Sequence, residues 1–171
     1  MEKARLRSIV REQIRLLDDA YIFESDRRIF EAVCRLPEYR RAGRVFLYCS
    51  VEREIDTAAI RAHAEKEGKL VAFPRVYGGG RMDFAGVDGL PAMFFGIPQP
   101  SADLPAIVPR KGDIMLVPAL CYDVDGYRLG QGGGYYDRFL ADCPAVTVGL
   151  GRERLMLRRL PRQMHDVPVS I

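Results

Sequence analysis

A glycine-rich segment between Arg128 and Arg138 carries the clearest chemical signal in the sequence. It reads Arg-Leu-Gly-Gln-Gly-Gly-Gly-Tyr-Tyr-Asp-Arg, with four glycines within five positions, and it changes abruptly into a helix-forming run at Tyr135. Glycine lets backbone N–H groups converge on one point without interference from Cβ atoms. The start of a helix adds further free N–H groups and the positive end of its dipole. The segment therefore predicts an anion site, and phosphate is the usual anion.

The charged residues beside these glycines favour a phosphate site, although a flexible surface turn remains an alternative interpretation. The spacing matches neither the Gly-x-Gly-x-x-Gly nor the Gly-Lys-Ser/Thr form of phosphate loop. However, Arg128 and Arg138 flank the glycines, and arginine pairs well with phosphate oxygens. Asp137 adds a carboxylate of the kind that binds magnesium.

Composition limits the class of protein. The chain has 171 residues, of which 48% are hydrophobic and 29% are charged, as in an ordinary globular protein. The net charge of +3 is too small to indicate nucleic-acid binding, and no apolar run is long enough to cross a bilayer. The 4 cysteines show no Cys-x-x-Cys spacing, and the first residues lack an apolar signal segment. We therefore expect one cytoplasmic domain over residues 1–171, monomeric or weakly self-associating, without nucleic-acid or membrane partners.

The elements that must position the loop alternate between helices and strands. Apolar residues at three- and four-residue steps predict amphipathic helices, and short apolar runs predict buried strands. This order predicts an α/β layered fold, with a largely parallel central sheet flanked by helices. The expected helices cover 2–19, 25–36, 57–68 and 135–140, and the expected strands cover 44–49, 70–73, 82–84, 114–118 and 145–148.

Two further segments bear on the site. The run Gly78-Gly79-Gly80 predicts a hairpin turn, and the five prolines of residues 87–112 predict a long ordered loop. In parallel sheets, ligands bind at the carboxyl ends of the strands. Glu54 and the loop after Val117 both follow expected strands, so we expect them to share one cleft.

Both ends of the chain hold candidate site residues. Lys3 and Arg7 lie one turn apart at the start of the first helix, where cations oppose the helix dipole, and this indicates a nearby anion. Asp166 could join Asp137 as a second oxygen ligand of magnesium. His165 is expected to be an ordinary surface side chain rather than a catalytic group.

Together these segments resemble the 5-formyltetrahydrofolate cyclo-ligases, also called methenyltetrahydrofolate synthetases. Residues 129–138 are similar to the family signature Leu-Gly-x-Gly-x-Gly-Tyr-Tyr-Asp. The other similar segments follow in the same order along the chain, and the resemblance runs from about residue 3 to residue 169. These segments are 3–7, 50–57, 95–100 and 165–168.

The resemblance implies ATP- and magnesium-dependent cyclisation of 5-formyltetrahydrofolate to 5,10-methenyltetrahydrofolate, with release of ADP and phosphate. It implies catalytic positions at Arg128, Tyr135 and Asp137, and magnesium ligands at Asp137 and Asp166. We expect the tyrosines to pack and position rather than to make bonds. The implied ATP-binding residues are Lys3, Ala4, Arg5, Leu6, Arg7, Arg128, Leu129, Gly130, Gln131, Gly132, Gly133, Gly134, Tyr135 and Tyr136. The implied folate-binding residues are Cys49, Glu54, Gln131, Gly132, Gly133, Gly134 and Tyr135.

Three other functions are compatible with these residues. The chain could be another ATP-dependent ligase or kinase acting on a different small acid or amide. It could be a non-catalytic paralogue that binds nucleotide or folate. A nucleic-acid-binding module would use Arg7, Arg11 and Arg15, which form a stripe on one face of the expected first helix. However, the low net charge and the lack of interleaved aromatic and basic residues argue against this function.

Overall fold

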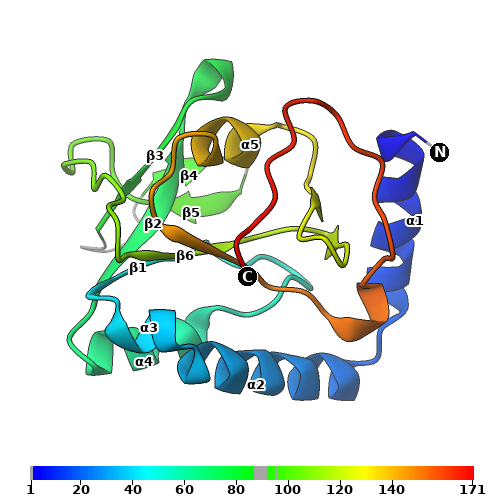
Figure 1. Ribbon diagram of the computed structural model, residues 1–171, viewed down its shortest axis with the longest axis horizontal. Coiled ribbons are helices and arrows are strands. Elements are labelled where there is room, and N and C mark those ends of the chain that lie inside the picture. Colours follow the sequence, from blue (N-terminus) through cyan, green and yellow to red (C-terminus); the bar gives the residue numbers. More distant parts are fainter. Residues whose placement is uncertain (1, 87–91, 95) are drawn as a thin grey trace.

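The protein is built around a five-stranded sheet with the strand order β3-β2-β1-β6-β9 (Figure 1). The computed structural model describes residues 2–86, 92–94 and 96–171. Only the edge strand β3 runs antiparallel to its neighbour, so the largely parallel α/β fold expected from the sequence is confirmed. The strands are β1 (Arg44–Phe46), β2 (Leu70–Val76), β3 (Met82–Ala85), β6 (Ile114–Val117) and β9 (Val146–Gly149).

Neighbouring residues of each buried strand face opposite sides of the sheet, as the two-residue period of a strand requires. In β6, Ile114 and Leu116 pack under α2 (Asp19–Arg35), α3 (Pro37–Arg41) and α4 (Ala58–Lys66). Met115 and Val117 pack on the other face, under α5 (Tyr135–Leu140). Helices therefore cover both faces of the sheet (Figure 1).

The first helix, α1 (Lys3–Leu16), stands beside the sheet rather than on it (Figure 1). Its buried residues Leu6 and Val10 pack in a separate apolar cluster. The cluster also contains residues of the hairpin β7 (Cys121–Tyr122) and β8 (Arg128–Leu129), and of the short helix η2 (Glu153–Leu155). This packing holds the start of α1 next to the strand that leads into the glycine loop. No helix of the described residues is both long and apolar enough to span a membrane.

The predicted start of the second helix at Ser25 is wrong, because α2 already begins at Asp19. The Asp18 carboxylate accepts a hydrogen bond from the Tyr21 amide at 2.7 Å, so Asp18 caps the helix in place of the predicted Ser25. The first helix correspondingly ends at Leu16, earlier than expected. Pro37 ends α2 as predicted, and it also opens α3, where its missing N–H is not needed.

Pro74 does not end the second strand, as the sequence had predicted, and β2 continues to Val76. Pro74 pairs with Phe84 of β3. The Phe84 carbonyl accepts a hydrogen bond from the Ile107 amide at 2.6 Å instead of one from β2. On the β3 side of the strand, the missing N–H of Pro74 therefore costs no ladder hydrogen bond. The first strand is shorter than predicted, because regular pairing stops after Phe46.

The predicted hairpin turn at the second glycine run is confirmed, since η1 (Gly78–Gly80) connects the antiparallel strands β2 and β3. The proline-rich segment is only partly a loop, because β4 (Ala92–Phe94) and β5 (Ile97–Gln99) form a hairpin within it. Pro91 and Phe95, which belong to this segment, lie outside the described residues.

Candidate active site

A cleft of about 380 Å³ opens at the carboxyl ends of β1, β2 and β6. Its lining includes Tyr48 after β1, Val76 at the end of β2, and Ala119 after β6. Glu54 and the loop after Val117 both reach it, as the strand order predicted. The fold therefore brings together segments that are far apart in the sequence.

The glycine loop forms one wall of this cleft and lies against α1. Gly132 and Gly134 have φ angles of 108° and 67°, which side chains other than glycine rarely adopt. The Arg7 guanidinium donates from Nε to the Gly130 carbonyl oxygen at 2.8 Å. A Cβ atom on Gly132 would lie 3.4 Å from the Arg7 Cζ atom. The loop thus needs glycine for its backbone shape, and at Gly132 it lies in van der Waals contact with Arg7 of α1.

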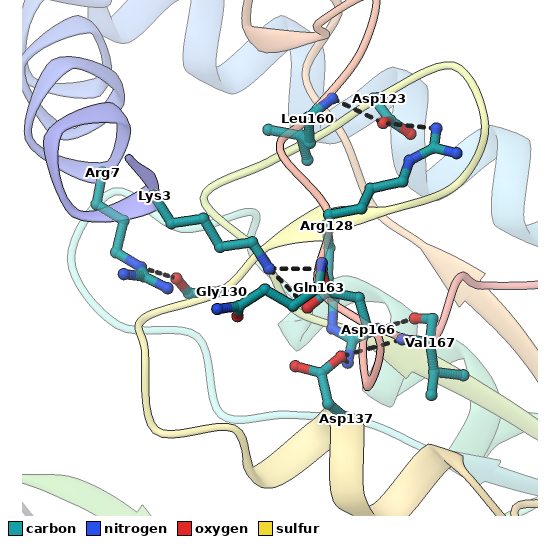
Figure 2. Close-up of polar contacts among 11 residues, drawn as sticks. Lys3, Arg7, Asp123, Arg128, Gly130, Asp137, Leu160, Gln163, Asp166 and Val167 are labelled. Atoms are coloured by element: carbon teal, nitrogen blue, oxygen red, sulfur yellow. Dashed lines mark hydrogen bonds and ion pairs between the residues drawn. The ribbon is translucent and has the colours of Figure 1, made fainter. Parts of the chain in front are cut away.

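An ion pair and a hydrogen bond connect the cleft to the C-terminal segment, and a second ion pair joins Arg128 to α5 (Figure 2). Arg128 Nη2 donates to Asp137 Oδ1 at 2.6 Å, and Arg128 Nη1 donates to the Val167 carbonyl at 2.7 Å. Lys3 Nζ lies 2.6 Å from both oxygens of Asp166. Each acidic residue that the sequence assigned to magnesium is therefore neutralised by a cation that the sequence assigned to ATP.

The pKa of Asp166 reflects this pairing. Burial alone would raise the pKa, but the hydrogen bonds from Lys3 and from the Gln163 amide lower it below its usual value. Asp166 is therefore ionised at neutral pH, and Lys3 neutralises its charge in the ligand-free site.

Glu54 lies at another part of the cleft, largely removed from water. Burial raises the pKa of its carboxyl, while hydrogen bonds from the Val51 amide and the Gln131 side chain partly oppose that rise. Burial also raises the pKa of the neighbouring Cys49 thiol to about 11. Cys49 is therefore a neutral thiol that can contact a ligand but is not a nucleophile.

The hydroxyl of Tyr136 is buried without a hydrogen-bond partner among the described residues. Burial is also the main reason why its pKa is raised, so it remains protonated. The nearby Tyr122 hydroxyl is satisfied, because it donates to the Val117 carbonyl at 2.7 Å. An unsatisfied buried donor is costly, and one that lines a cleft is available for a ligand.

The cleft contains all but three of the site residues expected from the sequence. Leu6 is instead buried in the apolar cluster under α1, and Ala4 and Arg5 are exposed on that helix. His165 is exposed, as expected, and lies at the rim. The cleft is also lined by residues to which the sequence had assigned no role, and several of these are apolar. For most of them, the only signal in the sequence was a position near the end of a strand. They are Tyr48, Pro74, Val76, Met82, Ile97, Pro98, Gln99, Pro118, Ala119 and Gln163.

The donor set tests whether the site suits magnesium. Across the described residues, no group of three or more His, Cys, Asp or Glu side chains gathers as a metal cage. Magnesium, however, binds readily through one or two carboxylates when phosphate oxygens and water complete its shell. Asp137 and Asp166 fit such an ion, provided that it arrives with a phosphate ligand.

The fold and the cleft define an α/β protein whose ligand site joins a glycine loop to a half-buried carboxylate. A sequence profile of the 5-formyltetrahydrofolate cyclo-ligase family matches residues 1–171, and the chain therefore belongs to that family of enzymes.

Individual relatives agree with this assignment. A probable 5-formyltetrahydrofolate cyclo-ligase of Schizosaccharomyces pombe is 30% identical over 148 residues, which cover 82% of this chain and 72% of the relative. The 5-formyltetrahydrofolate cyclo-ligase of Mus musculus is 26% identical over 184 residues, covering 98% and 91%. The solved structure of the Aquifex aeolicus 5,10-methenyltetrahydrofolate synthetase matches with a TM-score of 0.86 at 31% identity, covering 99% of this chain and 88% of that one.

Proposed function

We propose that this chain converts 5-formyltetrahydrofolate and ATP into 5,10-methenyltetrahydrofolate, ADP and phosphate. One observation carries the proposal: a single cleft joins the half-buried Glu54 carboxylate to a glycine loop bordered by Lys3, Arg7 and Arg128. A pterin ring offers N–H donors to a carboxylate, and a triphosphate offers oxygens to cations and loop amides. The family relationship over the whole chain supports the same pair of substrates.

The two ion pairs suggest how the site receives ATP. The phosphate oxygens accept hydrogen bonds from Lys3 and Arg128. These two cations then depend less on Asp166 and Asp137 to balance their charge. Asp137 and Asp166 would hold magnesium, which supplies positive charge to the phosphate oxygens. Each of these charges therefore has an opposite charge beside it before and after the nucleotide enters, and no buried charge is left alone.

Glu54 positions the other substrate. Its ionised carboxylate accepts hydrogen bonds from the pterin, and partial burial strengthens these bonds because water competes less for the oxygens. Cys49, as a neutral thiol, and Tyr135 contact the folate along the same cleft.

The reaction needs two substrates held in contact more than it needs a strong base. The formyl oxygen bonds to the γ-phosphorus, the bond between that phosphorus and the β,γ-bridging oxygen breaks, and ADP leaves. N10 then bonds to the formyl carbon, the carbon–oxygen bond breaks, phosphate leaves, and N10 loses its proton to solvent. Arg128 neutralises charge on the transferred phosphoryl group, while Asp137 keeps the Arg128 guanidinium in place.

The direct test is absorbance. Purified protein is mixed with 5-formyltetrahydrofolate, ATP and magnesium, and the more conjugated methenyl product is expected as a new long-wavelength band. The band should require all three components and should grow with ADP release. ATP binding without this band would refute the proposed reaction and leave another ligase or a non-catalytic binding role.

We further propose that the protein works in the cytoplasm as a monomer or weak homo-oligomer. All four cysteines are free in the structure, which suits a reducing compartment. Sedimentation at micromolar concentration tests the oligomeric state.

A further inference from the structure

The exposed side chain of Arg138 connects two glycine turns that are far apart in the sequence. Its Nη2 atom donates to the Gly133 carbonyl at 2.6 Å, in the loop that lines the cleft. Its Nε atom donates to the Gly80 carbonyl at 3.0 Å, in the η1 turn between β2 and β3. Figure 1 shows this turn next to α5, the helix that carries Arg138.

Both turns leave room for the guanidinium only because they carry glycine. A Cβ atom on Gly80 would lie 2.3 Å from Arg138 Nη2, and one on Gly134 would lie 2.9 Å from Arg138 Nη1. The guanidinium also lies over the Tyr135 ring, 5.6 Å from its centroid. Three contacts thus hold one planar group in one orientation, an arrangement that arginine supports and lysine does not.

The loop needs such a support. It contains four glycines within five positions, so its backbone has many accessible conformations when it is free. A loop that is ordered before the ligand arrives loses less entropy on binding and binds more tightly. The hydrogen bond to the Gly133 carbonyl fixes the loop at its centre, and the hydrogen bond to Gly80 anchors that support to the sheet.

We propose that Arg138 is a positioning residue that holds the glycine loop in its ATP-binding shape by tying it to the η1 turn. The inference rests on the proposed function, because it assigns ATP to this loop. The tie itself belongs to the free protein and can be measured without substrate. It also gives a role to the second glycine run, which the reaction itself does not require.

The chain provides a matched pair of variants. Gly79 and Gly80 have φ angles of 73° and 76°, so an alanine at either position strains the backbone equally. A Cβ on Gly79 meets nothing within 4 Å, whereas a Cβ on Gly80 displaces the Arg138 guanidinium. If the untied loop spends a tenth of its time in the binding shape, the dissociation constant for ATP rises about tenfold.

We therefore expect Gly80→Ala and Arg138→Ala to weaken ATP binding about tenfold in titration calorimetry. Gly79→Ala should stay within about twofold of the parent protein. Arg138→Lys should rescue only part of the loss, because an ammonium lacks the fork that spans both carbonyls. Adding Gly80→Ala to Arg138→Ala should have little further effect, since the tie is already lost.

Two results would overturn the inference: equal ATP affinity of Gly79→Ala and Gly80→Ala, or a Gly80→Ala effect that persists without Arg138. Hydrogen exchange of the amides of residues 130–134 in ligand-free protein separates this inference from the proposed function. Faster exchange in Arg138→Ala and Gly80→Ala, but not in Gly79→Ala, supports the tie even if the protein fails to form the methenyl product. Unchanged exchange in Arg138→Ala refutes the tie even if the enzyme is active.

Discussion

Replacing Asp137 with asparagine should separate the two functions of its carboxylate. Asparagine keeps the shape but removes the charge that faces the Arg128 guanidinium at 2.6 Å. The Arg128 side chain is 3% exposed and that of Asp137 is 25% exposed, so the variant leaves a buried cation without its counter-ion. Breaking such a pair costs about 3–5 kcal/mol.

The structure favours the lower end of that range. Arg128 keeps its hydrogen bond to the Val167 carbonyl, and water reaches part of the Asp137 side chain. We therefore expect the free energy of unfolding to fall by about 3 kcal/mol, measured by urea denaturation. Glu65→Gln is the control, because it removes the charge from an exposed pair with Arg61 and should cost less than about 1 kcal/mol.

ATP binding should change in the opposite direction. In the parent protein an incoming phosphate competes with Asp137 for Arg128, and the carboxylate also repels it. Without this charge, magnesium-free ATP should bind about tenfold more tightly, which corresponds to about 1.4 kcal/mol. Turnover with magnesium should fall at least about a hundredfold, because the metal loses a ligand and Arg128 loses the carboxylate that holds its guanidinium in place.

Titration calorimetry with ATP in EDTA and the absorbance assay with magnesium measure these two effects. Weaker magnesium-free ATP binding in Asp137→Asn would refute the idea that Arg128 and Asp137 neutralise each other in the ligand-free site. Retained turnover would refute the assignment of Asp137 to the metal and the phosphoryl group.

Three other predictions concern Glu54 and Tyr136, which both line the cleft. Glu54→Gln should raise the KM for 5-formyltetrahydrofolate at least about tenfold while the KM for ATP stays within about twofold; equal effects on both would reject the pterin contact. Burial raises the pKa of Glu54 above its ordinary 4.5, so the ionised form is lost as the pH falls through this higher value, and kcat/KM for folate should decline there. A pH profile that keeps this acid limb in Glu54→Gln would assign it to another group. Tyr136→Phe should raise the free energy of unfolding by about 1 kcal/mol in denaturant, since it removes a buried hydroxyl without a partner; a loss of similar size would reveal a partner.

The sequence predicted well where a local pattern alone decides the structure. The change from glycines to Tyr135 marks the start of α5, and the apolar run 114–117 marks a strand buried on both faces. The cleft could also be predicted, because parallel strands direct their carboxyl ends to one edge of the sheet. Glu54 and Ala119 follow two such strands and line the same cleft.

The sequence could not predict features that depend on residues distant in the chain. Pro74 stands within β2 because the Phe84 carbonyl opposite it faces Ile107, and nothing near Pro74 in the sequence indicates this. The pairing of Lys3 with Asp166 joins residues 163 positions apart, so spacing along the chain cannot reveal it. Such contacts become visible only when α1 and the C-terminal segment have been placed beside the loop.

The two parts of the cleft differ in how they are held, and this has a consequence for function. The proposed folate side rests on the sheet, since Cys49 and Glu54 follow the buried strand β1. The proposed phosphate side depends on Lys3 of α1 and on Asp166 of the C-terminal segment. That segment is fixed to β9 through hydrogen bonds from the amides of Ser170 and Ile171 to the Thr147 carbonyl, at 2.9 and 3.1 Å. Because the C-terminal segment is largely exposed whereas β1 is buried, local opening should weaken ATP binding before it affects folate binding.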